Sequence, residues 1–90
     1  MADGAGVLIA YPTPYTFKVM GLANGGGFPA HVRQLMTRFV GHVPEDSMRI
    51  RDSAKGKYQS ISVTVVLLSE DQRRSIYEAL HTDERVVYYL

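Results

Sequence analysis

The feature that most constrains the fold of this chain is a run of two-residue alternation near its middle. Between residues 58 and 67, one set of alternate positions is aliphatic, comprising Ile61, Val63, Val65 and Leu67. From residue 58 to residue 64, the other set of alternate positions is polar or aromatic and comprises Tyr58, Ser60, Ser62 and Thr64. Successive side chains of a strand point to opposite faces of its sheet. We therefore expect a strand with one face in a core and the other face polar.

The sequence pattern predicts three further strands. Residues 15–20 follow two prolines that disfavour helix, and their alternation places Tyr15, Phe17 and Val19 in the core, opposite Thr16, Lys18 and Met20. At residues 48–51 the apolar Met48 and Ile50 are expected inward and the two arginines outward. The turn at residues 53–56 ends on Gly56, which we expect to adopt a positive φ. Residues 86–90 form the last strand.

Two amphipathic helices separate these strands. The first is expected to begin near Pro29 and to end at Pro44. Its apolar face has helical spacing and comprises Phe28, Val32, Leu35, Met36, Phe39 and Val43. The second opens on Ser69 and Gln72, the spacing of a capping box, and turns Ile76, Ala79 and Leu80 inward.

The element order β-α-β-β-α-β predicts an α+β fold of the ferredoxin-like type. In that fold two helices cover one face of a four-stranded antiparallel sheet. A chain of 90 residues has room for one such domain. We assign it to residues 11–90 and expect residues 1–10 to be a disordered N-terminus.

Two blocks of this sequence resemble the YbeD family of small bacterial proteins. Residues 11–21 read YPTPYTFKVMG, and residues 53–64 read SAKGKYQSISVT. The family is recognised by a Pro-Thr-Pro-aromatic entry to a Lys-Val-Met-Gly strand and by a Lys-Gly-x-aromatic-x-Ser hairpin. The resemblance runs from about Tyr11 to Leu90. It implies a ferredoxin-like domain similar to the ACT-type regulatory modules of metabolic enzymes, and it carries the label of a lipoate-related regulatory protein without an activity or catalytic residues.

The composition disfavours several classes of function. The chain has no cysteine, and His31, His42 and His81 lack the spacing of metal ligands, so we expect neither a metal site, nor a cofactor, nor an enzyme. The acidic residue in the opening stretch and an apolar run of only four residues at positions 65–68 predict a cytoplasmic protein with no membrane segment.

The polar face of the expected sheet carries the candidate ligand-binding residues. They are basic, hydroxyl-bearing or aromatic, and comprise Lys18, Arg49, Arg51, Lys55, Lys57, Tyr58, Ser60 and Ser62. Cations on neighbouring strands can converge on a carboxylate or phosphate, so we expect a regulatory or interaction module for a small anionic metabolite or a protein partner. The alternative is a solvated face screened by Asp52 and the acids of the second helix. An anion site at the glycine tract of residues 25–27 is less favoured than a flexible loop.

Two partner hypotheses complete the prediction. An RNA-binding platform is the alternative function, but only Tyr58 is placed to stack on a base and the net charge is only +1, so nucleic acid is disfavoured. The last strand carries no charge or proline to protect it as a sheet edge. We expect it to support a homodimer, unless its tyrosines pack beneath a helix instead.

Overall fold

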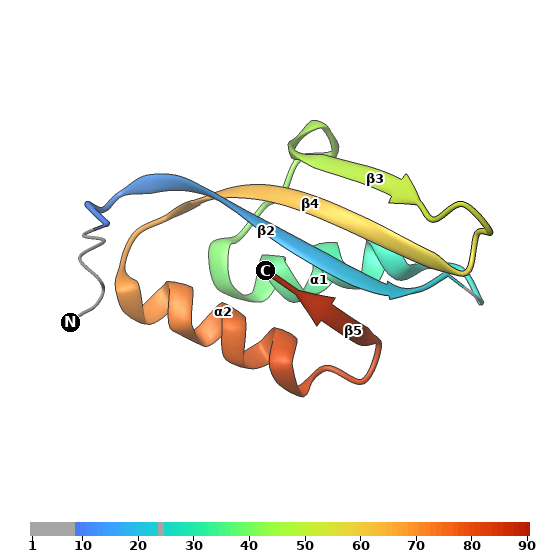
Figure 1. The fold of residues 1–90 in the computed structure, drawn as a ribbon. Helices are drawn as coiled ribbons and strands as arrows, with labels where there is room; N and C mark the ends of the chain where they lie inside the picture. The colour runs from blue at the N-terminus through green and yellow to red at the C-terminus, as the bar shows by residue number, and fades with distance from the viewer. Residues whose placement is uncertain (1–8, 24) are drawn as a thin grey trace.

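The computed structural model describes residues 9–23 and 25–90, so residues 1–8 of the expected disordered N-terminus lie outside the described part. The elements follow the predicted order, with one short added 3-10 helix. They are β2 (Thr13–Leu22), α1 (Phe28–Val40), η1 (Glu45–Ser47), β3 (Met48–Asp52), β4 (Tyr58–Leu67), α2 (Glu70–Thr82) and β5 (Val86–Tyr89). The ferredoxin-like α+β fold is confirmed (Figure 1).

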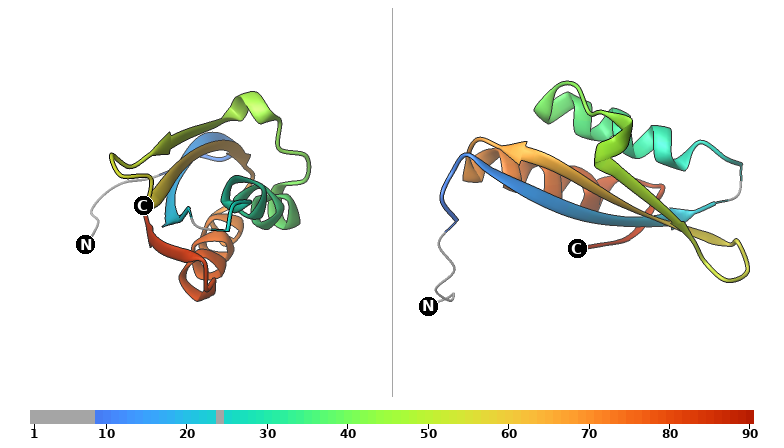
Figure 2. Two further views of the ribbon diagram at one scale, coloured as in Figure 1. Left: turned by 90° about the vertical axis from the view of Figure 1, so that its right-hand side faces the viewer. Right: turned by 90° about the horizontal axis from the view of Figure 1, so that it is seen from above.

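The four strands form one antiparallel sheet in the order β3-β4-β2-β5. Both helices lie on one side of this sheet, as the end-on view shows (Figure 2). The long central strands β2 and β4 pair along their whole lengths, from Thr13 opposite Leu67 to Leu22 opposite Tyr58. We call the side of the sheet away from the helices the open face.

The core lies between the sheet and the helices. It takes the alternate side chains of β2 and β4 that the sequence predicts, and Phe17, Val19, Ile61 and Val63 are all fully buried. The helices contribute their predicted apolar faces, with Phe28, Val32, Leu35 and Met36 from α1 and Ile76 and Leu80 from α2. The assignment of these residues to the core is confirmed.

Helix α1 ends earlier than its apolar spacing predicts. It stops at Val40, because Gly41 has a φ of 79° that breaks the helical backbone. The prediction that Pro44 marks the end was therefore wrong. Val43 is still buried, but it reaches the core from the loop after the helix, where its carbonyl oxygen accepts a hydrogen bond from Arg33 Nε at 2.9 Å.

The start of α2 agrees with the predicted cap in one of its two hydrogen bonds. Ser69 Oγ accepts a hydrogen bond from the Gln72 amide at 3.1 Å. The side chain of Gln72 accepts instead from the amide of Leu68, one residue before the cap, and donates to the carbonyl of Phe39 in α1 at 2.7 Å. Gln72 thus ties the two helices together, which a local capping pattern cannot predict.

Strand β3 departs from the predicted inward placement of its apolar residues. Met48 packs against the core, but Ile50 remains 54% exposed. The physical reason is that β3 is an edge strand, so its helix-side face is only partly covered. The following turn matches expectation, since Gly56 has a φ of 69°.

Candidate functional site

The open face is organised as rows of side chains that cross the strands. Residues directly opposite each other in an antiparallel sheet share a face. One row places Ser62 of β4 between Lys18 of β2 and Arg49 of β3. The next row places Ser60 between Met20 and Arg51. The register therefore brings three cations and two hydroxyl groups from three adjacent strands onto one surface.

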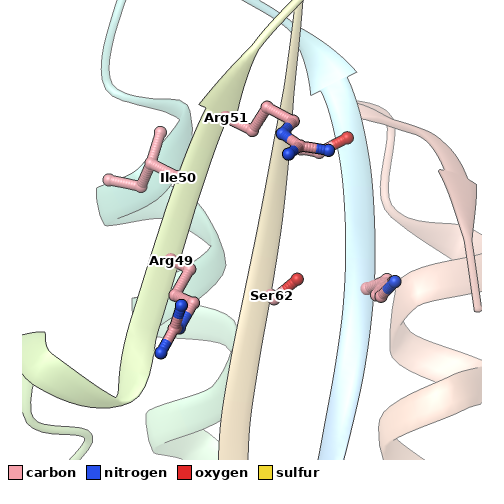
Figure 3. A pocket seen from close by; sticks show the side chains of 6 residues that line it. Arg49, Ile50, Arg51 and Ser62 are labelled. Carbon is pink, nitrogen blue, oxygen red and sulfur yellow. The ribbon is translucent and has the colours of Figure 1, made fainter.

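These side chains line a shallow hollow of about 610 Å³ on the open face. We call it the basic hollow, and its lining comprises Lys18, Arg49, Ile50, Arg51, Ser60 and Ser62. Figure 3 shows the two arginine side chains and Ser62 on the same side of the sheet, whereas the Ile50 side chain points away from them. The polar groups of the basic hollow are thus the two arginines, the lysine and the two serines.

In the described part of the chain, no carboxylate forms an ion pair with the cations of the basic hollow, although Asp46 shares an adjacent hollow with Arg49 and Ser62. Within residues 9–23 and 25–90, no ion pair within 4.0 Å involves Lys18, Arg49 or Arg51. Asp52 accepts a hydrogen bond from Gln59 at 3.0 Å, and the acids of α2 lie on the covered side of the sheet. Within the described ranges, neither Asp52 nor an acid of α2 therefore forms an ion pair with these three cations.

Three of the predicted site residues lie away from the basic hollow. Lys55 is in the β3–β4 turn and Lys57 is at its end, where its ammonium lies 5.4 Å from the centre of the Tyr58 ring. Tyr58 is half-buried at the start of β4, opposite Leu22. Of the five predicted cations, only Lys18, Arg49 and Arg51 therefore lie together. Lys55 and Lys57 lie elsewhere because the turn places them beyond the end of β3.

The structure adds one aromatic residue to the open face that sequence reasoning missed. Tyr88 of β5 lies opposite Met20, next to a β-bulge between Met20 and Gly21, and it is 56% exposed. Its neighbour Tyr89 lies opposite the core residue Val19 and packs against Tyr77, with ring centres 5.9 Å apart. Alternation does separate the two tyrosines, but only the register with β2 reveals which of them faces outward.

A second polar cluster lies on the helix side of the sheet. Tyr11 donates to Glu70 at 2.6 Å, Arg73 Nη1 donates to the same carboxylate at 2.9 Å, and the hydroxyls of Tyr15 and Tyr77 are 2.8 Å apart. The bond from Tyr11 and the charge of Arg73 hold the pKa of Glu70 below its usual value. Burial and the bond to Tyr15 raise the pKa of Tyr77. These groups satisfy one another, which fits a role in anchoring α2 to β2.

The pKa of Tyr15 moves in the opposite direction. Burial alone would raise the Tyr15 pKa, but the hydrogen bonds with Tyr77 and Arg73 outweigh burial and lower it. Arg73 also lies over the rings of Tyr15 and Tyr77, at 5.5 and 5.3 Å from their centres. The guanidinium is thereby engaged by partners on both sides, and it offers little to an external ligand.

In residues 9–23 and 25–90, histidines and carboxylates do not assemble a metal centre. Over the described ranges, no group of three or more histidine, cysteine, aspartate or glutamate side chains could hold a metal ion. His31 instead bonds to Asp83 at 2.7 Å, and His81 to the hydroxyl of Tyr89 at 3.2 Å. In the same ranges, none of the helices is long and apolar enough to span a bilayer.

The glycine tract is held by an arginine from the other end of the chain. Arg85 donates to the carbonyl of Gly26 at 2.9 Å and lies 5.6 Å from the centre of the Phe28 ring. The backbone carbonyl of Arg85 also packs closely against Gly21, so that a side chain at position 21 would collide with this carbonyl and with the Phe28 ring. This contact is long-range, so the local sequence gave no signal of it.

Comparison with known proteins matches residues 7–90 to the family DUF493, described as a protein of unknown function. The UPF0250 protein YE3006 of Yersinia enterocolitica is 36% identical over 80 residues, which cover 88% of this chain and 87% of that protein. The UPF0250 protein YbeD of Salmonella arizonae is 38% identical over 74 residues, covering 81% and 80% respectively.

Among solved structures, the solution structure of protein HP0495 from H. pylori resembles this chain. The TM-score is 0.71 with 19% sequence identity, and the match covers 98% of this chain and 91% of that one. At this level of identity, the likeness supports the fold alone and says nothing about the chemistry of the basic hollow.

Proposed function

The chain belongs to the DUF493 family of proteins of unknown function, and we propose that it is a non-enzymatic module that binds a small anionic ligand on the open face of its sheet. The observation that carries this proposal is the basic hollow. Three cations and two hydroxyls from three adjacent strands line it, and within residues 9–23 and 25–90 no carboxylate pairs with the cations.

The residue types of the basic hollow favour an oxyanion. Arginine presents a planar fork of donors that matches two oxygens of a carboxylate or phosphate, and such charge-assisted hydrogen bonds are about twice as strong as neutral ones. Lys18 adds a compact charge from β2, while Ser60 and Ser62 supply donors on the strand between. A rigid central strand holds these hydroxyls, which reduces the ordering cost of binding.

A regulatory role is part of this proposal. The resemblance to ACT-type modules supports it, because those modules sense small molecules without performing chemistry on them.

The proposed function includes a homodimer formed through β5. This strand lies at the edge of the sheet, and its residues Val87 and Tyr88 are more than half exposed. An exposed apolar edge offers free backbone groups to a second strand. Because β5 carries no charge, two copies can approach without repulsion along it.

Titration of the protein with inorganic phosphate, followed by two-dimensional nitrogen NMR, tests the proposed ligand site. We expect saturable shifts at the amides of Lys18, Arg49, Arg51, Ser60 and Ser62. The variants Lys18→Ala and Arg51→Ala should each weaken binding roughly tenfold or more, since each removes a charged hydrogen-bond donor. Their melting temperatures should stay close to that of the unchanged protein.

Arg74→Ala is the matched control. Arg74 is an exposed arginine on α2, on the covered side of the sheet, so its loss changes the net charge equally but leaves the hollow intact. If Arg74→Ala weakened phosphate binding as much as Arg51→Ala does, the attraction would be general and the proposed site would be wrong. A large fall in melting temperature for Lys18→Ala and Arg51→Ala would show that these residues are structural.

RNA binding is the second candidate function, and Tyr88 is the observation that favours it. With Tyr58, it gives the open face two aromatic residues. An RNA platform should bind single-stranded RNA at low salt and lose affinity steeply as salt rises. The small-ligand proposal predicts no RNA binding up to high micromolar concentrations.

A further inference from the structure

The open face changes character from β3 to β5. Along one row the side chains run from Arg51 on β3, through Ser60 on β4 and Met20 on β2, to Tyr88 on β5. The row is thus cationic at one end, hydroxylic next, and apolar and aromatic at the other end. A ligand that contacted the whole row would need an anionic group at the β3 end and an apolar group at the β5 end.

The spacing of the row sets the size of such a ligand. Neighbouring strands lie about 4.8 Å apart, so Tyr88 lies about 10 Å from Ser60, which lines the basic hollow. Met20 lies between them and adjoins both. One small molecule with a single ring system can therefore reach from the hollow to the Tyr88 ring.

Tyr88 is available for this contact. It is 56% exposed, and within the described ranges it makes no side-chain hydrogen bond and no ring–ring contact. Its neighbour Tyr89 is held by His81 and Tyr77, so the fold employs one tyrosine of the pair and leaves the other on the open face. The thioether of Met20 is a favourable partner for an aromatic ring.

From this arrangement we propose that the ligand of the open face is an aryl oxyanion. Its phosphate or carboxylate group binds Lys18, Arg49 and Arg51, and its flat apolar ring lies on Met20 and Tyr88. This inference rests on the proposed function, and it adds an aromatic ring to the anionic group of the proposed ligand. The aromatic contact supplies selectivity, because the cations alone would accept any oxyanion of suitable size.

The experiment compares inorganic phosphate, phenyl phosphate and 1-naphthyl phosphate by NMR titration. We expect 1-naphthyl phosphate to bind at least tenfold more tightly than inorganic phosphate, with additional shifts at Met20 and Tyr88. Tyr88→Ser should abolish this gain and leave the affinity for inorganic phosphate unchanged, whereas Tyr88→Phe should keep the gain. A parallel series of acetate, benzoate and 1-naphthoate determines whether the anionic group is a phosphate or a carboxylate.

The outcomes separate this inference from the proposed function. If inorganic phosphate binds in the basic hollow and the aryl phosphates bind no better, the aryl contact is wrong and the anion site stands. If the aryl phosphates bind but Tyr88→Ser has no effect, the ring lies elsewhere and the inference fails. If none of the six anions binds, both proposals fail together. Val66→Ser, at an equally exposed position of the open face outside this row and outside the edge strand, controls for a general loss of apolar surface.

Discussion

At the scale of single residues, position within β4 decides whether an aliphatic side chain supports the fold. Val63 is fully buried, whereas Val66 in the same strand is 56% exposed on the open face. We expect Val63→Ala to lower the free energy of unfolding by about 1–3 kcal/mol, because it removes buried methyl groups and leaves a cavity. Val66→Ala makes the same chemical change without a cavity, and its effect should be within about 0.5 kcal/mol.

Denaturant unfolding of both variants measures this difference. Equal effects for the two would contradict the assignment of faces on which the basic hollow depends, since Lys18, Ser60 and Ser62 are placed by the same alternation. The face of the sheet that each of these side chains occupies could be predicted from the sequence. In a long central strand with a two-residue period, only one arrangement buries the aliphatic side chains. The predicted burial of Ile50 was wrong. Alternation placed Ile50 on the correct side of the sheet but could not show that the helices cover this side poorly at β3.

At the scale of elements, Glu70 connects the N-terminal turn of α2 to Tyr11, which lies just before β2. The carboxylate accepts from Tyr11 and pairs with Arg73, and these contacts lower the pKa of Glu70 in the folded protein. A carboxyl with a lowered folded pKa stabilises the protein above its unfolded pKa of about 4.3, and this contribution is lost as the pH falls through the folded value. The sequence predicted the helix start correctly but not this long-range fastening.

We expect Glu70→Gln to be less stable than the unchanged protein at pH 7, with the difference shrinking as the pH falls below about 4. Thermal unfolding over a pH series measures the difference. Tyr11→Phe removes the hydrogen bond and keeps the carboxylate, so the side-chain carboxyl of Glu70 should titrate at a higher pH in that variant, as followed by carbon NMR. A difference between Glu70→Gln and the parent that is constant from pH 7 to pH 3 would show that the charge of Glu70 is not what stabilises this contact.

At the scale of the whole molecule, the fold followed from the sequence more fully than the open face did. Strand order and helix placement are set by periodicity and by the limited ways in which a βαββαβ chain can connect. The membership of the basic hollow depends on where a turn carries Lys55 and Lys57, and the exposure of Tyr88 depends on register beside a bulge. Both are consequences of pairing between distant segments, which no local pattern encodes.

The proposed homodimer is also a property of the whole molecule, because it depends on which strand the fold leaves at the edge. Lys18 and Leu90 exchange both backbone hydrogen bonds, at 3.0 and 2.8 Å, so the antiparallel pattern turns the backbone groups of the adjacent Tyr89 toward the free side of β5. A second β5 can pair with these groups. We therefore expect a species of twice the 10.0 kDa chain mass at micromolar concentration.

Light scattering coupled to size-exclusion chromatography measures the mass directly, and Val87→Lys tests the location of the interface. A lysine on an edge strand opposes pairing with another edge, so this variant should be monomeric with an unchanged fold. Val66→Lys is its matched control, since Val66 is equally exposed at 56% but lies on the central strand β4. It should remain dimeric. A 10 kDa species for the unchanged protein would end the dimer proposal, and a dimer disrupted by Val66→Lys but not by Val87→Lys would move the interface from the edge to the open face.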